Sequence, residues 1–256
     1  MERRYRLRAG QLGPTQSSTV SCGAACLALA RMLGDPATAR WVIEGVDASR
    51  RAPGRAGEGP TERFARLERH IHRRTNSVLT YPGRVQAPWP RSLGTSPWGA
   101  RIELEQHAAQ GLSRYGLLSV RHLPAARLAG VFDEVVARVR PGSPALLYVG
   151  SGLAPRHACL LFRDPVDGSV LLYEPLTGAV SVPSRESFAA SHLGLGGWNR
   201  AWFVLAPGAE APVAVRALRA LVPRPAPGVV GPAVLRDSVP GLLRETVPRA
   251  PDACPR

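Results

Sequence analysis

The stretch Gln16-Ser-Ser-Thr-Val-Ser-Cys22-Gly-Ala-Ala-Cys-Leu-Ala-Leu-Ala-Arg-Met-Leu-Gly34 organises the rest of the chain. Almost all residues from Gly23 to Leu33 are small or apolar. Four of them share one face at the i, i+3, i+4, i+7 spacing of a buried helix: Cys26, Leu29, Ala30 and Leu33. Gly34 and Pro36 are residue types that end helices. The stretch therefore predicts a buried helix over residues 22–33.

The start of this helix is a place where a thiol gains reactivity. Ser21 is a candidate N-cap, which puts Cys22 in the first turn. Unpaired N–H groups and the positive end of the helix dipole favour an anion there, so we expect a bias toward the thiolate, the nucleophilic form. Gln16 lies upstream in a polar run. Its carboxamide and the Cys22 N–H are candidate donors to an oxyanion.

A Gln followed after five residues by Cys-Gly and a helix of small residues resembles the papain-like cysteine peptidases. The run Ser21-Cys-Gly-Ala-Ala-Cys-Leu-Ala28 is most similar to their bacterial branch, which contains the double-glycine (bacteriocin leader) peptidases. The resemblance covers residues 15–35 and 145–205. It implies a His on a later strand and an acid followed by Pro on the next one. His157 and Glu174 match these positions, although the acid of that branch is usually Asp.

The predicted elements are helices first, then consecutive strands joined by tight turns such as Asp167-Gly168. Helices are expected over 22–33, 37–44, 61–73, 98–112, 128–140 and 185–190, and strands over 115–120, 145–149, 157–162, 169–174, 179–182 and 201–205. Thr61, Ser96 and Ser184 are candidate helix caps. This order predicts an α+β fold with helices against an antiparallel sheet. The resemblance implies the papain-like form of that fold, with the nucleophile helix packed on the sheet.

The segment 74–99 is rich in Pro, Gly and Trp and predicts an irregular loop. Trp89 and Trp98 in this loop can line a groove for an extended peptide, or they can cover the core. Gly23 beside the nucleophile and Arg156 beside the base are the other candidate substrate contacts.

Length and composition indicate one folded domain and a tail. The 256 residues suffice for a domain, expected over 1–206, whose core needs no disulfides. From 207 the composition shifts toward Pro and Arg, so 207–256 is predicted to be a partly ordered tail that can dock a partner. Four scattered Cys, a charged N-terminus without a signal-peptide pattern and the lack of a long apolar run predict a cytoplasmic protein without a membrane span.

The formal net charge is +14, and all 33 basic residues are Arg. Abundant Arg, Ala, Gly and Pro are typical of a GC-rich genome, so the charge by itself does not indicate a nucleic-acid partner. Few aromatic residues lie among the Arg residues, which argues against a stacking platform for single strands. We expect a peptide or protein substrate and no nucleic acid. The Cys and His spacings match no usual zinc site, so neither a metal nor a cofactor is predicted.

Acyl transfer by a thiolate needs a nucleophile, a base, a group that orients the base, and donors for the oxyanion. Cys22, His157, Glu174 and Gln16 fill these four roles in this order. The sequence therefore predicts a thiol hydrolase that cleaves a peptide or amide bond. Two alternatives stay open: an acyltransferase or transglutaminase-like enzyme that passes the acyl group to an amine, and a noncatalytic peptide-binding module of the same fold.

Overall fold

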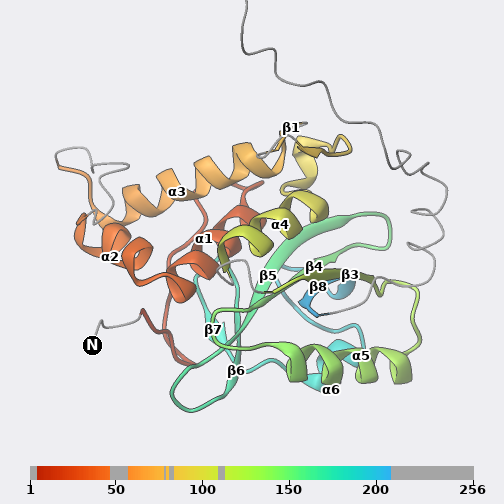
Figure 1. The fold of residues 1–256 in the computed structure, drawn as a ribbon. Coiled ribbons are helices and arrows are strands. Elements are labelled where there is room, and N and C mark those ends of the chain that lie inside the picture. Colours follow the sequence, from red (N-terminus) through yellow and green to blue (C-terminus); the bar gives the residue numbers. More distant parts are fainter. Residues whose placement is uncertain (1–4, 47–56, 78, 81–83, 109–112, 209–256) are drawn as a thin grey trace, which may run out of the picture. The chain divides into compact units, whose positions relative to one another are not determined.

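An antiparallel sheet of six strands, in the order β3-β8-β4-β5-β6-β7, carries the fold in the computed structural model (Figure 1). The strands are β3 (Tyr115–Ser119), β4 (Ala145–Gly150), β5 (Pro155–Arg163), β6 (Val170–Tyr173), β7 (Val180–Ser181) and β8 (Arg200–Pro207). The structure describes residues 5–46, 57–77, 79–80, 84–108 and 113–208, all of which belong to one unit, Met1–Arg216. A second unit, Ala217–Arg256, and the predicted tail from residue 209 onward lie outside the described residues.

Helices cover the sheet. They are α1 (Cys22–Gly34), α2 (Pro36–Glu44), α3 (Pro60–Thr75), α4 (Pro97–Glu103), α5 (Ala125–Arg138) and α6 (Arg185–Ala189). Together with the antiparallel sheet they confirm the predicted α+β class. None of the helices in the described part of the chain combines the length and the apolar composition that crossing a lipid bilayer requires.

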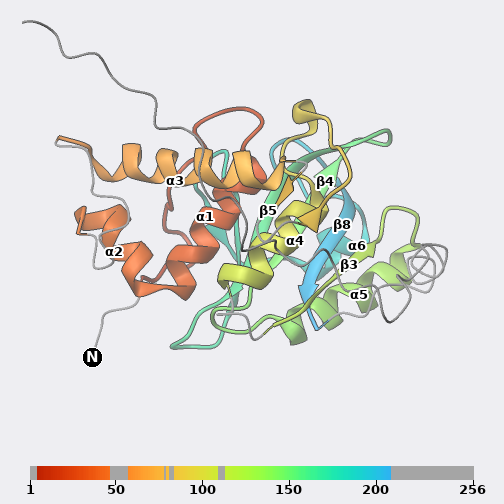
Figure 2. The same cartoon turned by 45° about the horizontal axis from the view of Figure 1, so that its top comes forward.

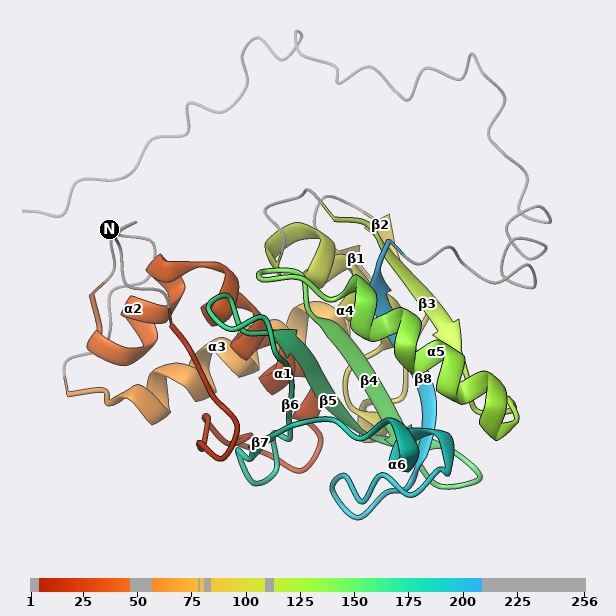
Figure 3. The same ribbon diagram turned by 90° about the horizontal axis from the view of Figure 1, so that it is seen from below.

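The sheet separates two apolar cores, because successive side chains of a strand point to opposite faces. On β5, Ala158 and Leu160 belong to the core that contains α1, whereas Cys159 and Leu161 belong to the core that contains α5 and α6. Figure 2 shows α1 and α3 side by side on one side of the sheet, and Figure 3 shows α5 and α6 on the other.

Small side chains allow α1 to lie close to the sheet. Ala24, Ala25 and Ala28 are fully buried, and α1 packs against both β5 and α3. The Cys26 thiol of α1 donates a hydrogen bond to the Ala158 carbonyl of β5, with an S–O distance of 3.4 Å. Because the helix begins at Cys22, this packing brings the candidate nucleophile to one end of the sheet.

The hairpin of β5 and β6 brings the candidate base and acid together. In its register Leu160 pairs with Tyr173 and Leu161 with Leu172. Gly168, with a φ of +75°, provides the left-handed residue of the turn. His157 near the start of β5 and Glu174 just after β6 therefore lie at the same end of the hairpin.

Several local predictions need correction. Thr61 does not cap α3, which instead begins at Pro60 after Gly59 at the N-cap. The helix expected over 98–112 ends at Glu103 and continues as a π-helical turn, Leu104–Ala108, and residues 109–112 lie outside the described residues.

The segment 74–99 was expected to be irregular, but it contains two short paired strands, β1 (Leu79–Thr80) and β2 (Arg84–Val85), and a 3-10 turn, Arg91–Leu93. The caps of Ser96 and Ser184 are confirmed, because the first accepts from the Gly99 N–H and the second from the Ser187 N–H.

Candidate active site

Cys22 is the first residue of α1, and only 5% of its surface is exposed. The prediction that the side chain of Ser21 caps this helix is wrong. The Ser21 hydroxyl instead donates to the Ser18 carbonyl at 2.9 Å and accepts from the Ser18 N–H at 3.1 Å. No side chain caps the first turn of α1, so the N–H groups of that turn are open to an anion.

Gly94 and Thr95, in the predicted loop segment 74–99, pack against the start of α1. A methyl group on Gly94, which has a φ of +75°, would lie 2.9 Å from the Val20 carbonyl oxygen and 4.0 Å from the Cys22 sulfur. A methyl group on Gly23 would lie 2.7 Å from the Thr95 Cβ. Gly23, expected to contact substrate, is therefore buried against Thr95 in this structure. The two glycines let the loop approach the nucleophile closely.

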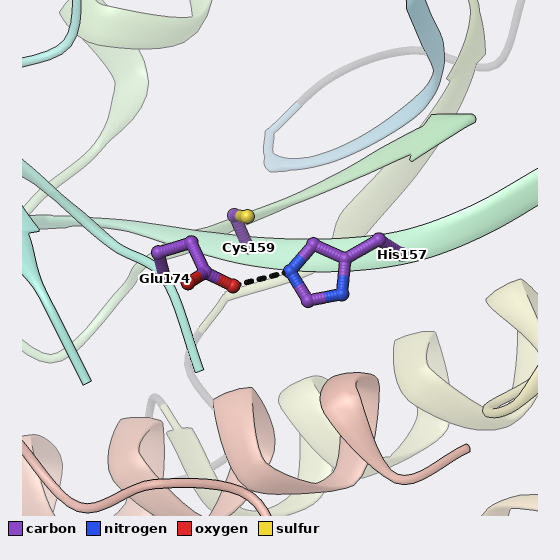
Figure 4. Close-up of side chains that lie close together, drawn as sticks. All are labelled: His157, Cys159 and Glu174. Carbon is purple, nitrogen blue, oxygen red and sulfur yellow. Dashed lines mark hydrogen bonds and ion pairs between the residues drawn. The ribbon is translucent and has the colours of Figure 1, made fainter. Parts of the chain in front are cut away.

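His157 and Glu174 form a buried pair (Figure 4). The His157 Nε2 and Glu174 Oε1 atoms are 2.6 Å apart. The carboxylate also accepts from the Leu176 N–H at 2.9 Å and from the N–H and hydroxyl of Thr177 at 3.0 and 2.7 Å. These donors fix the carboxylate, and the carboxylate in turn fixes the plane of the imidazole.

The electrostatics of the pair favour charge on both groups. Burial opposes ionisation of Glu174, but the hydrogen bonds from His157, Leu176 and Thr177 lower its pKa from 4.5 to about 2. Burial also opposes protonation of His157, yet hydrogen bonding to the Cys159 and Cys22 thiols and to Glu174 raises its pKa from 6.5 to about 12.

Cys159 lies in the apolar core and, unlike Glu174, carries no charge beside the His157 imidazole. Burial raises the pKa of the Cys159 thiol to about 11, so this thiol is neutral near pH 7. Glu174 therefore supplies the negative charge next to the imidazole. Nε2 of His157 is bonded to the Glu174 carboxylate, and Nδ1 points away from it (Figure 4). The ring is therefore oriented to exchange a proton at Nδ1.

Gln16 is tied to the same end of the sheet. Its main-chain N–H donates to the carbonyl of Pro175, the residue after Glu174, at 2.8 Å. Its carboxamide nitrogen donates to the Ser18 carbonyl at 2.8 Å, which uses one of the two N–H groups of that nitrogen. The other N–H remains for a ligand, so the oxyanion role of Gln16 stays a prediction.

A buried carboxylate from α3 holds the Gln16 loop. Glu68 is fully buried, and both of its carboxylate oxygens accept from the Ser17 N–H at 3.0 Å. Sequence reasoning missed this residue, because Glu68 is 51 positions away from Ser17 and carries no motif.

Replacing Glu68 by Met should loosen the Gln16 loop, since a side chain of similar size remains but the acceptor is lost. A hydrogen bond to a charged group contributes about 1.5–3 kcal/mol, so we expect amide exchange at Ser17 to accelerate by about tenfold or more. Hydrogen exchange measured by NMR gives this rate. Glu62→Met on the exposed face of the same helix is the control. Unchanged protection of Ser17 in Glu68→Met would contradict the assignment.

The remaining candidate substrate contacts are Trp89, Trp98 and Arg156. The Trp89 and Trp98 rings pack edge to face, with centroids 5.1 Å apart and an interplanar angle of 88°. The Trp98 Nε1 donates to the Ala87 carbonyl at 2.8 Å, and both indoles are half-buried. Arg156, next to His157, is exposed. Their contact with substrate stays a prediction.

The site also contains atoms that can bind a metal. His157, Cys159 and Glu174 each offer one ligand atom, and these three atoms lie within 4.8 Å of one another. An ion would have to displace the hydrogen bond between His157 and Glu174 and the proton of a buried thiol. Cys26 faces the opposite core, where its thiol bonds the Ala158 carbonyl, so it does not join this group. The hydrogen bond between His157 and Glu174 can remain intact in proton transfer and nucleophilic attack, whereas metal binding would break it.

Comparison with known proteins does not assign the chain to a family. No family model matches the sequence, and no curated protein matches it either. The assignment of function below rests on the residues and their geometry.

Proposed function

We propose that this chain is a papain-like cysteine peptidase that forms an acyl-enzyme on Cys22. The observation that carries the proposal is the buried His157–Glu174 pair, with 2.6 Å between Nε2 and Oε1. Beside it stands the position of the Cys22 thiol at the start of α1, the helix that packs on the strand of His157. A nucleophile at a helix start, a base on a strand and an acid that orients the base are the parts that thiol-based acyl transfer requires.

The reaction starts from a Cys22 thiolate and a His157 imidazolium. The sulfur attacks the carbonyl carbon of a peptide or amide, and the Cys22 N–H and Gln16 carboxamide hold the resulting oxyanion. When the tetrahedral intermediate collapses, the C–N bond breaks and the amine leaves with the proton of His157. The neutral imidazole then takes a proton from water, the hydroxide attacks the thioester, and the thiolate is released. Glu174 stays ionised and holds the ring.

The fold and the state of the cysteines support this proposal. In papain-like enzymes the nucleophile helix packs on an antiparallel sheet, and here α1 packs on β5 of such a sheet. Cys22, Cys26 and Cys159 are free thiols. Free thiols suit a reducing compartment, and we place the protein in the cytoplasm on this ground.

An activated ester tests the acyl-enzyme directly. With 4-nitrophenyl acetate we expect a burst of nitrophenolate equal to the enzyme concentration and an acetyl group on Cys22 in the intact mass. Glycinamide added in increasing amounts then shows whether water or an amine takes the acyl group. Faster turnover with transfer to glycinamide would identify an acyltransferase instead of a hydrolase.

Two variants control for acetylation elsewhere. Cys22→Ser should abolish both the burst and the added mass, whereas Cys26→Ser should retain both, since Cys26 is a buried thiol of the same helix that faces the core. If the wild-type protein shows neither a burst nor an acetylated Cys22, Cys22 is not a nucleophile. The alternative of a noncatalytic peptide-binding module would then be favoured.

A further inference from the structure

A glycine from the loop before β8 lies directly on the candidate base. Gly196 has a φ of +56°, and a methyl group on its Cα would lie 2.8 Å from Cδ2 of His157 and 3.0 Å from both Cγ and Nε2. Real Cβ atoms do not approach other atoms this closely, so the backbone of Gly196 is in contact with the ring. The contact lies on the part of the ring that carries Nε2, the nitrogen bonded to Glu174.

The loop around Gly196 has its own anchors. Leu195 and Trp198 exchange two main-chain hydrogen bonds of 3.0 and 2.9 Å, and the Gly194 N–H donates to the Asn199 side chain at 3.0 Å. The side chain of Leu195 is buried in the core beneath α5 and α6. Immediately after the loop, Arg200 pairs with Gly150 of β4. The position of Gly196 is therefore set by the sheet and not by the imidazole that it contacts.

We propose that Gly196 is a positioning residue for His157. Its backbone covers the Cγ–Cδ2–Nε2 part of the imidazole, keeps the ring in line with Glu174, and excludes water from the Nε2–Oε1 hydrogen bond. This inference rests on the proposed function, because it matters for catalysis only where His157 acts as the base. A hydrogen bond that water cannot reach is stronger than an exposed one, so the cover keeps His157 oriented while its other nitrogen exchanges a proton.

The neighbouring glycine offers a matched control. Gly197 has a φ of +81°, close to that of Gly196, but a methyl group there would have no heavy atom within 4 Å. Alanine at either position therefore adopts a positive φ, which costs an L-residue free energy. Only Gly196→Ala also pushes a methyl group against the imidazole.

Two readouts on Gly196→Ala and Gly197→Ala test the inference. We expect Gly196→Ala to slow iodoacetamide labelling of Cys22 near pH 6 by about tenfold or more, because the base is displaced. The His157 Nε2–H proton should also exchange faster with water in the NMR spectrum. Gly197→Ala should keep the labelling rate and the slow exchange of the wild type, with a similar loss of thermal stability.

The outcomes separate this inference from the proposed function. Equal labelling and exchange in the two alanine variants would overturn the role of Gly196. A wild-type protein whose Cys22 labels no faster than an ordinary thiol would overturn the proposed function, while the exchange of the Nε2–H proton would still report on the cover.

If Gly196→Ala does not fold, the wild type still decides the question. A nuclear Overhauser effect between the Gly196 Hα and the His157 Hδ2 protons supports the contact. Its absence, or rapid exchange of the Nε2–H proton, overturns it.

Discussion

Cys22 of the wild-type protein will react with iodoacetamide at a rate that is nearly constant from about pH 5.5 to pH 8, whereas in His157→Ala the rate will fall about tenfold per pH unit below about pH 8. The difference arises because only the thiolate reacts. An ordinary thiol has a pKa of about 8.5, so each lower pH unit removes nine tenths of its thiolate. An imidazolium that stays charged throughout this range keeps the thiolate paired. Intact mass spectrometry with peptide mapping gives the rate at Cys22.

The control for this experiment is another histidine variant. His192→Ala removes an exposed imidazole just after α6 and should leave the wild-type profile unchanged. A wild-type rate that itself falls tenfold per pH unit would mean that no ion pair forms between Cys22 and His157. Catalysis by this pair would then have to be abandoned.

Glu174→Gln will lower the pKa of His157 by about 1–3 pH units, because it removes the negative charge bonded to Nε2 and keeps the shape of the side chain. The wild-type value of about 12 should therefore move toward the ordinary range. NMR titration of the His157 ring protons measures it. Thr177→Val, which removes one donor to Glu174 but no charge, should change the pKa of His157 far less.

The stabilisation that Glu174→Gln removes is expected to depend on pH. The lowered pKa of Glu174 stabilises the fold above its ordinary value of 4.5, and this stabilisation is lost as the pH falls through about 2. The raised pKa of His157 stabilises the fold fully below 6.5, and this stabilisation is lost as the pH rises through about 12. Both act fully between pH 4.5 and 6.5. Urea unfolding should show the largest advantage of wild type over Glu174→Gln in this window and a smaller one at lower pH. A difference in unfolding free energy between wild type and Glu174→Gln that is the same at every pH would contradict the ion pair.

Local patterns were sufficient to predict most of the elements. The small residues of α1, the continuous apolar run of β5 and the Asp167-Gly168 turn are local features, so each can be recognised from a few neighbouring residues. The order of these elements then indicated the α+β class. The prediction of the Ser21 cap failed because the backbone of Ser18 takes its hydroxyl.

The candidate site was predicted in part. His157 and Glu174 follow from a hairpin and from a family resemblance, and the structure pairs them at 2.6 Å. The sequence had no signal for Thr95 against Gly23 or for Glu68 on the Ser17 N–H. These contacts join positions that are 51 or more residues apart, and neither partner belongs to a motif.

By itself the sequence determined where helices and strands form, and in which order a thiol, an imidazole and a carboxylate occur along them. Those properties depend on neighbours within one or two turns of the chain. Only the tertiary structure decided that β8 enters the sheet between β3 and β4, and that the loop before it places Gly196 on the His157 ring. The reason is physical: such contacts arise when surfaces from distant segments pack around a common core, and their geometry is a property of that packing and not of any short stretch of residues.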